Sequence, residues 1–353
     1  MTRTEARHGK PLASVPMSKL TAGPHVSAIP WLWHGLIARH IVTLITSPPK
    51  TGKTTLFTGL MQQLAAGGTF LDRPVQPARV LYVSEEPNTN WEDRVGRMPL
   101  GDHCELMAEP FVTQPTPEEF EDLVQYAMEM QAAGKLDLLV IDSLFEFLPG
   151  ATDSDAIALR RMIRPLKCLT RAGAAVVIMQ HPRREPSAEG HSARGHGSLL
   201  ASVDIQVELS KYGRLRSDAR RRKLIALSRF PETPESLVYE WDPNTSRFTF
   251  LGDPLSVRFR ENWARVLAIL QKRKRAATAL ELLDDWPADL DCPATTTMYE
   301  WLNRAYEEKR VRRIGAGRRK DPFRFRLENE DDAYLDRGEL PPVRRLDPRE
   351  VIG

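Results

Sequence analysis

One stretch near the N-terminus restricts the fold more than any other, because three types of segment follow each other there without a break. An apolar run, Ile41-Val-Thr-Leu-Ile-Thr46, leads into the polar loop Ser47-Pro-Pro-Lys-Thr-Gly-Lys-Thr54. Apolar residues then recur at helical spacing from Leu56 to Leu64. β-Branched residues favour strands, and spacings of three and four favour a helix. The order predicts a strand that enters a helix through a tight loop.

The loop fits the phosphate-loop pattern Gly-x-x-x-x-Gly-Lys-Ser/Thr except at its first position, which is Ser47. Gly52 lets the backbone approach a phosphate, and the N–H groups of the first helical turn point at the anion. Lys53 supplies a cation for the β- and γ-phosphates, and the Thr54 hydroxyl can reach Mg²⁺. We therefore predict that ATP and Mg²⁺ bind to Ser47, Pro48, Pro49, Lys50, Thr51, Gly52, Lys53, Thr54 and Thr55. The alternative is a chance match, against which the strand-to-helix context argues.

Three later apolar runs also end in polar side chains. Residues 79–84 end in Glu85-Glu86, residues 136–141 end in Asp142, and residues 174–179 end in Gln180-His181. Open α/β sheets bind ligands at the carboxyl ends of their strands, so we expect these groups to converge. Asp142 is predicted to hold Mg²⁺, a glutamate to act as general base, and Gln180 with His181 to sense the γ-phosphate. The alternative is that they are ordinary polar strand ends.

Alternation of apolar strands with amphipathic helices predicts an α/β fold with a doubly wound, mostly parallel sheet over residues 29–252. Alternation also predicts a strand at 204–209, and the segments at 223–229, 236–241 and 247–251 read as antiparallel strands that close this domain. The large apolar groups of Trp31 to Leu36 precede the first strand. They are interpreted as packing beneath the sheet, with a platform for the nucleotide base as the alternative.

Two basic stretches interrupt this domain. Residues 182–197 are rich in Pro, Gly, Ser, His and Arg, and a loop of this length is usually functional or disordered. Residues 211–223 hold seven Lys or Arg residues against Asp218 alone. The second stretch has two interpretations, a solvated hairpin or part of a phosphate-binding surface.

A second domain is expected at residues 258–327. Amphipathic segments at 260–270, 277–286 and 293–309 predict three helices, and residues 311–327 predict a β-hairpin around Gly315-Ala-Gly317. Three helices and a hairpin are typical of a winged helix-turn-helix, with Thr295, Thr296 and Thr297 at the start of the recognition helix. The alternative is a protein-docking module. Basic side chains suited to DNA phosphates lie in the hairpin at Arg312, Arg313, Arg318, Arg319, Lys320, Arg324 and Arg326.

The remaining features concern the chain as a whole. Residues 1–28 are polar and read as a flexible arm, and residues 328–353 as a disordered tail. Cys104, Cys168 and Cys292 lie far apart, which suggests a reducing compartment. No apolar run approaches a membrane span, and the first residues have no signal-peptide core. We expect a cytoplasmic protein without membrane contact.

The motif order over residues 28–252 resembles the RecA-type ATPases of the RepA/KaiC/DnaB branch, in particular RepA-like AAA ATPases. The resemblance rests on Ser-Pro-Pro-Lys-Thr-Gly-Lys-Thr, Val-Leu-Tyr-Val-Ser-Glu-Glu-Pro, Leu-Leu-Val-Ile-Asp-Ser, Val-Val-Ile-Met-Gln-His-Pro-Arg and Ala193-Arg-Gly-His-Gly-Ser-Leu199. It implies a RecA-like core in which Glu86 is the catalytic glutamate, with Glu85 as the runner-up.

The resemblance also implies contacts beyond one subunit. Leu227-Ser228-Arg229 matches a Lys-x-Arg supplied to the neighbouring subunit's γ-phosphate, with the lysine replaced by Leu227. The loop at 182–197, with Arg183, Arg184 and Arg194, matches a DNA-contacting loop. We therefore expect a homo-oligomer, with a hexamer as one form, that acts on DNA as an ATP-dependent motor or loader for a replicon or mobile element. The alternatives are a nucleotide-gated DNA-binding switch and a KaiC-like signalling ATPase.

Overall fold

The computed structural model describes residues 14–17, 29–147, 156–181, 202–213, 219–273, 275–288, 290 and 292–328. The chain divides into two compact units, Met1–Leu251 and Gly252–Gly353, and each is described by itself. Most of the predicted N-terminal arm, all of the basic loop 182–197 and nearly all of the predicted tail lie outside the described residues.

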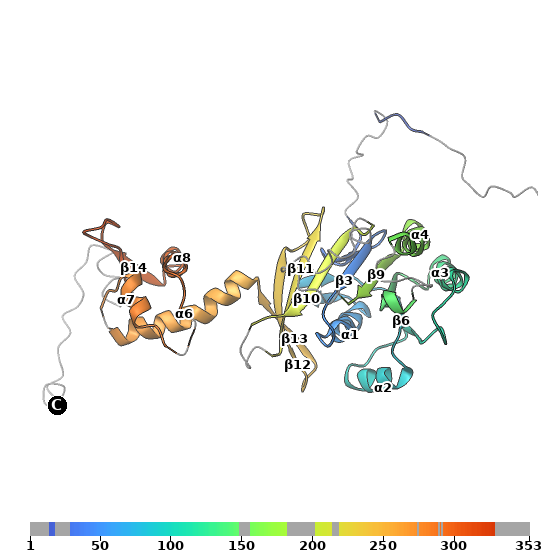
Figure 1. Ribbon diagram of the computed structural model, residues 1–353, viewed down its shortest axis with the longest axis horizontal. Coiled ribbons are helices and arrows are strands. Elements are labelled where there is room, and N and C mark those ends of the chain that lie inside the picture. Colours follow the sequence, from blue (N-terminus) through green and yellow to red (C-terminus); the bar gives the residue numbers. More distant parts are fainter. Residues whose placement is uncertain are drawn as a thin grey trace, which may run out of the picture. The chain divides into compact units, whose positions relative to one another are not determined.

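The first unit is built on a nine-stranded sheet in the order β13-β12-β11-β10-β3-β9-β8-β6-β7 (Figure 1). The six strands from β10 to β7 in this order are parallel, whereas β11 is antiparallel to both β10 and β12. The expected α/β fold with a large, mostly parallel sheet is thereby confirmed. The strands are β3 (Val42–Thr46), β6 (Val80–Ser84), β7 (Cys104–Ala108), β8 (Leu138–Asp142), β9 (Ala175–Gln180), β10 (Ile205–Lys211), β11 (Arg221–Ser228), β12 (Ser236–Asp242) and β13 (Arg247–Gly252).

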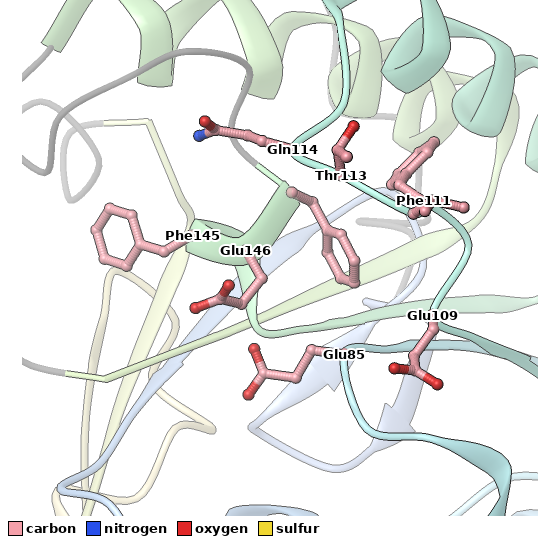
Figure 2. A pocket seen from close by; sticks show the side chains of 9 residues that line it. Glu85, Glu109, Phe111, Thr113, Gln114, Phe145 and Glu146 are labelled. Carbon is pink, nitrogen blue, oxygen red and sulfur yellow. The ribbon is translucent and has the colours of Figure 1, made fainter.

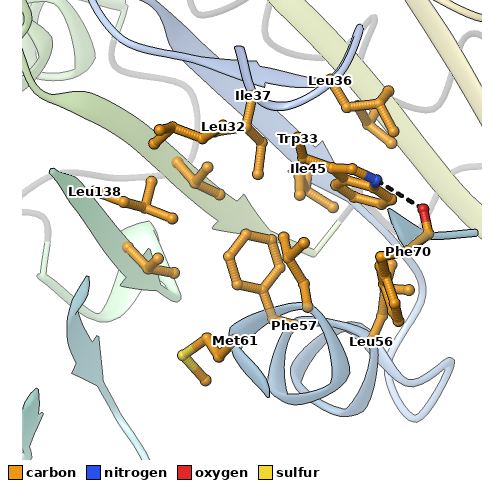
Figure 3. Packing of buried hydrophobic residues seen from close by; sticks show 14 of the residues in the cluster. Leu32, Trp33, Leu36, Ile37, Ile45, Leu56, Phe57, Met61, Phe70 and Leu138 are labelled. Carbon is orange, nitrogen blue, oxygen red and sulfur yellow. Dashed lines mark hydrogen bonds between the residues drawn. The ribbon is translucent and has the colours of Figure 1, made fainter. Parts of the chain in front are cut away.

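Helices cover both faces of this sheet. On one face, α1 (Lys53–Leu64) buries Leu56, Phe57 and Leu60 in a core that includes Ile45 and Leu138 (Figure 3). On the other face, α3 (Pro117–Ala132) and α4 (Ala156–Ala172) flank a second core, to which the short 3₁₀ helix Leu144–Phe147 also contributes. Thr116 and Glu119 form a reciprocal capping box that fixes where α3 begins. The sheet is therefore buried on both sides around its central strands.

Strands on both sides of α1 in the sequence form a small second sheet, in the order β2-β1-β5-β4. It contains β1 (Trp31–Trp33), β2 (Ile37–Ala38), β4 (Gly68–Phe70) and β5 (Arg73–Val75). Trp33 is 1% exposed, and its Nε1 donates a hydrogen bond to the Phe70 carbonyl at 3.1 Å. The interpretation of this tryptophan as a packing residue beneath the sheet is confirmed.

One helix of this unit was not anticipated from the pattern of apolar residues. Helix α2 (Asn88–Arg97) follows the two glutamates and buries a single side chain, Trp91. A helix that buries one residue has no apolar stripe, so the sequence shows no helical spacing of apolar residues there.

The second unit contains three helices and one hairpin. These are α6 (Pro254–Arg273), α7 (Ala279–Asp284), α8 (Thr295–Glu307), β14 (Val311–Ile314) and β15 (Arg324–Leu327). The number and order of expected elements are as predicted, but the expected bounds of the first helix, 260–270, were too narrow at both ends. Val257 and Phe259 face inward and extend its apolar stripe towards the N-terminus. Among the described residues, no helix combines the length and apolar character that a bilayer span requires.

The packing of β13 on α1 generates a stability prediction. A Cβ at Gly59 would lie 2.3 Å from Cε2 of Phe248, whose ring packs between Phe70 and Tyr239. Gly59→Ala should therefore lower the free energy of unfolding by about 1–3 kcal/mol through overpacking.

The matched control is Gly96→Ala in α2, where a Cβ meets nothing within 4 Å. It should raise stability by up to about 1 kcal/mol, since alanine favours helices over glycine. Urea unfolding of both variants is the measurement. Equal free energies of unfolding for the two variants would show that the Phe248 ring does not pack tightly against Gly59 of α1.

Candidate active site

The polar loop lies at the sheet edge where β3, β6, β8 and β9 all end. Gly52 adopts φ +102°, in the left-handed region, and Lys50 also has a positive φ of 59°. Ser47 does not, so a serine fits at the position where the pattern has glycine. Its N–H donates to the Gln180 carbonyl at 3.2 Å, which ties the loop to β9. The loop walls a cavity of about 350 Å³ lined by Ser47, Pro48, Pro49, Lys50, Thr51, Gly52, Lys53, Thr54, Thr55, Glu85, Glu86, Arg94, Asp142 and His181.

Lys53 is only 6% exposed although it carries an ammonium group. Its Nζ lies 3.0 Å from Nδ1 of His181, and the same Nδ1 lies 3.1 Å from the Ser47 carbonyl. One imidazole nitrogen cannot both accept from Lys53 and donate to Ser47, so the two contacts compete. Burial lowers the pKa of Lys53, and the nearby negative charges of Asp142 and Glu85 oppose that shift. An incoming anion would be a stronger partner for this ammonium than a neutral imidazole.

Asp142 joins the end of β8 to the first turn of α1. The Thr54 hydroxyl donates to its Oδ2 at 3.0 Å, and the buried Tyr82 hydroxyl donates to the same oxygen at 2.6 Å. Burial, and then the carboxylate itself, raise the pKa of Tyr82 well above its usual value, so this tyrosine remains a donor. A hydroxyl and a carboxylate side by side suit a hard, oxygen-preferring cation such as Mg²⁺.

The two glutamates after β6 have different surroundings. The Ser143 hydroxyl donates to Oε2 of Glu85 at 2.8 Å, and burial raises the pKa of Glu85. Glu86 instead forms an ion pair with Arg94 at 2.8 Å. The Arg94 guanidinium lies over the Trp91 ring, 4.5 Å from its centroid. Its Nη1 is buried and has no hydrogen-bond partner within the described part of the chain.

Glu85 also lines a second cavity of about 470 Å³, which the phosphate loop does not reach. Figure 2 shows its carboxylate near that of Glu146, whereas Glu109 lies on the other side of the Glu85 side chain. The negative charge of Glu146 adds to the rise in the Glu85 pKa. The environment of Glu85 is therefore less favourable to a charged carboxylate than open water.

The other predicted site residues are not in the loop cavity. The Gln180 side chain is 1% exposed within the sheet edge, and its Oε1 has no partner among the described residues. Arg229 pairs with Asp204 at 2.7 Å, and its side chain is 75% exposed. Arg183, Arg184 and Arg194 lie outside the described residues. The predicted wing contacts belong to the second unit.

Sequence reasoning missed two residues of this site, Tyr82 and Arg94. Tyr82 lies in a strand that was recognised, so counting alternate residues along β6 would have found it. Arg94 had no such signal, because it lies on the helix whose apolar pattern is absent.

Three comparisons with known proteins bear on this site. Residues 6–187, more than half of the 353, match the AAA domain family. No curated protein matches the chain. Among solved structures, the flagellar accessory protein FlaH from Methanocaldococcus jannaschii is similar at 11% identity and a TM-score of 0.44, over 60% of this chain and 90% of that one. The family match covers the phosphate loop, both strand-end carboxylate positions and the buried lysine, and the chain accordingly belongs to the AAA domain family and is a nucleotide-hydrolysing ATPase.

Proposed function

We propose that this chain hydrolyses MgATP in the loop cavity and couples the reaction to DNA through its C-terminal unit. The observation that carries the proposal is the 3.0 Å contact between Thr54 and Asp142, formed beside the buried Lys53. It brings together a hydroxyl, a carboxylate and a cation that have no common packing role. These are the groups that phosphoryl transfer needs around its metal and phosphates.

The donor set fits both ligands. Gly52 leaves the backbone bare, and even a Cβ at this position would have no atom nearer than 4.0 Å, so a phosphate can approach the loop. Both contacts to Asp142 fall on Oδ2, and its other oxygen and Thr54 would hold Mg²⁺ directly or through water. Bound Mg²⁺ supplies charge neutralisation on the phosphates. Lys53 would leave His181 for the phosphates, which frees the His181 imidazole to meet the γ-phosphate.

Glu85 has the better geometry for the general base. It is half-buried near Asp142 and Lys53 and is oriented by Ser143, whereas the Glu86 carboxylate is occupied by Arg94. The raised pKa of Glu85 brings it closer to neutral pH, where a base is most effective. We therefore assign proton abstraction from water to Glu85, the runner-up from the sequence. Glu86 would hold Arg94, whose unpartnered Nη1 is available to an anion in the same cavity.

This assignment predicts different behaviour for two adjacent substitutions. Glu85→Gln keeps the side-chain shape and removes the base, so ATP turnover should fall by at least ~100-fold while nucleotide still binds. Glu86→Gln weakens only the hold on Arg94 and should retain more turnover. Steady-state phosphate release and nucleotide titration measure both. Loss of turnover in Glu86→Gln alone would restore the assignment made from the sequence.

Arg229 is proposed to act on the nucleotide of a neighbouring subunit. Strand β10 runs parallel to β3, and β11 returns antiparallel, with Ser228 opposite Ile205 and Ile205 beside Thr43. Arg229 therefore lies at the opposite sheet edge from its own loop. A phosphate within its reach has to belong to another copy, which supports a homo-oligomer with sites at subunit interfaces, a hexamer being one such assembly.

Subunit mixing tests this role. An arginine that stabilises the transition state can contribute ~10³-fold or more in rate, so Arg229→Ala should be slow alone. Mixed with Glu85→Gln subunits it should regain turnover, because some interfaces then pair an intact glutamate with an intact arginine. Asp204→Asn is the matched control, since it breaks the ion pair and keeps the cation. Failure to regain turnover in subunits shown to exchange would make Arg229 structural.

The C-terminal unit is proposed to be a winged helix that binds duplex DNA. Its element order supports this, as does an antiparallel bridge between Ala277 and Phe325 that adds a third short strand position beside the hairpin. Helix α8 buries Met298, Trp301 and Leu302 and leaves Thr295 and Thr296 exposed at its start. That arrangement leaves the expected recognition face accessible.

The basic residues of the wing divide into two groups. Arg313 is held between the rings of Tyr306 and Phe323, at 4.2 and 4.3 Å from their centroids, and Arg312 lies 3.5 Å from Glu328. These two have roles within the unit. The side chains of Arg318, Arg319 and Lys320 are exposed at the hairpin tip, so they are the better candidates for DNA phosphates.

Taken together, we propose that the protein is an ATP-dependent motor or loader of a replicon or mobile element. A forked duplex tests this role, because a motor should displace one strand in an ATP-dependent reaction. Hydrolysis and duplex binding without displacement would instead make the protein a nucleotide-gated switch.

Salt dependence tests the wing directly. Each phosphate contact contributes ~0.9 log units of affinity per log unit of salt, so changing Arg318, Arg319 and Lys320 to Ala should flatten the slope by up to ~3 and weaken all duplex sequences alike. Arg313→Ala, the control, should change the slope less, and DNA-free ATP turnover should not change in the triple variant. Identical slopes for parent and triple variant would favour a protein-docking role.

A further inference from the structure

One residue of the basic stretch at 211–223, Arg222, contacts the phosphate loop and has not yet been assigned a role. Because β10 is parallel to β3, with Glu208 beside Thr46, the end of β10 lies at the edge where the loop begins. Strand β11 starts from the same edge, and Arg222 lies opposite Lys211. The end of the β10–β11 ladder at Lys211 and Arg222 therefore adjoins the loop, one strand away from β3.

The Arg222 guanidinium connects two backbone segments. Its Nε donates to the Thr51 carbonyl at 2.7 Å, and its Nη1 donates to the carbonyls of Ala219 at 2.7 Å and Arg221 at 2.8 Å. Three acceptors around one planar group fix its orientation, which a lysine ammonium on a flexible stem would not reproduce. Arg222 thus joins the middle of the phosphate loop to the start of β11.

The loop has particular need of an external anchor. Pro48 and Pro49 have no N–H, so the first half of the loop has fewer backbone donors for internal hydrogen bonds. The residues on either side of Thr51 both adopt left-handed backbone angles, and Lys50 does so at φ 59° without being a glycine. A non-glycine residue in this region is strained, and it persists only where the surroundings hold it. The Arg222 contact lies at the centre of this strained stretch.

We propose that Arg222 is a positioning residue for the phosphate loop, so that nucleotide affinity depends on the end of the β10–β11 ladder at Lys211 and Arg222. This rests on the proposed nucleotide site, although Arg222 itself does not line the cavity. It acts by holding the Thr51 carbonyl, and with it the backbone angles that aim the following N–H groups at a phosphate. The ATP and ADP affinities should then change together, since both nucleotides carry the α- and β-phosphates that the loop surrounds.

The test compares Arg222→Ala and Arg222→Lys with a matched control, Arg220→Ala. Arg220 is two residues away on the same hairpin, where its exposed side chain pairs with Asp242 at 3.0 Å. Hydrogen exchange of the amides from Lys50 to Leu56 in the nucleotide-free protein is the first readout. It should accelerate at least tenfold in both Arg222 variants, without change in α3. It should stay at the parent rate in Arg220→Ala.

Nucleotide titration is the second readout. Both Arg222 variants should bind MgADP and MgATP at least tenfold more weakly than the parent. If Arg222→Ala does not fold, the more conservative Arg222→Lys variant provides the test. Parent-like exchange in the loop, or the same change in Arg220→Ala, would overturn the proposal. Because the exchange readout needs no nucleotide, a parent that binds none would refute the proposed function and leave this inference to be decided by exchange alone.

Discussion

The first unit is organised around the buried ammonium of Lys53, which forms no ion pair within the described part of the chain. Lys53 lies at the start of α1, 6% exposed, and its direct contact is with an imidazole nitrogen. Burial of a cation is costly unless an anion compensates, and the carboxylates of Asp142 and Glu85 act on it only through space. The fold maintains this position because both sheet faces are packed and α1 lies against Phe248 of β13. A nucleotide phosphate would supply the missing partner.

The strand order explains why the supporting groups meet. Strand β9 lies between β3 and β8, so Gln180 and His181 at its carboxyl end lie at the same sheet edge as the loop and Asp142. Strand β6 follows β8, which places Glu85 beside Ser143. Residues far apart in the chain reach one edge because parallel strands all end there. The same geometry sends Arg229 to the other edge, since β11 runs in the reverse direction.

Much of this was predictable from local patterns. The strand-loop-helix stretch, the carboxylates at strand ends and the antiparallel closing strands all have signals within a few residues, and the structure has them. The environments of Glu85 and Glu86 had no such signal, because the difference between them comes from Ser143, 58 residues away in the chain, and from a helix with one buried residue. The two groups of wing arginines were likewise indistinguishable, since stacking on Tyr306 and Phe323 is a tertiary contact.

Lys53 is proposed to meet a nucleotide phosphate in the loop cavity. Calorimetric titration of MgATP, together with phosphate release, tests it on the parent, Lys53→Ala and Lys50→Ala. Lys50 is the matched control because it belongs to the same loop but is exposed. Lys53→Ala should lose ATP binding or turnover, whereas Lys50→Ala should keep most of both. Normal turnover in Lys53→Ala would contradict the proposed contact.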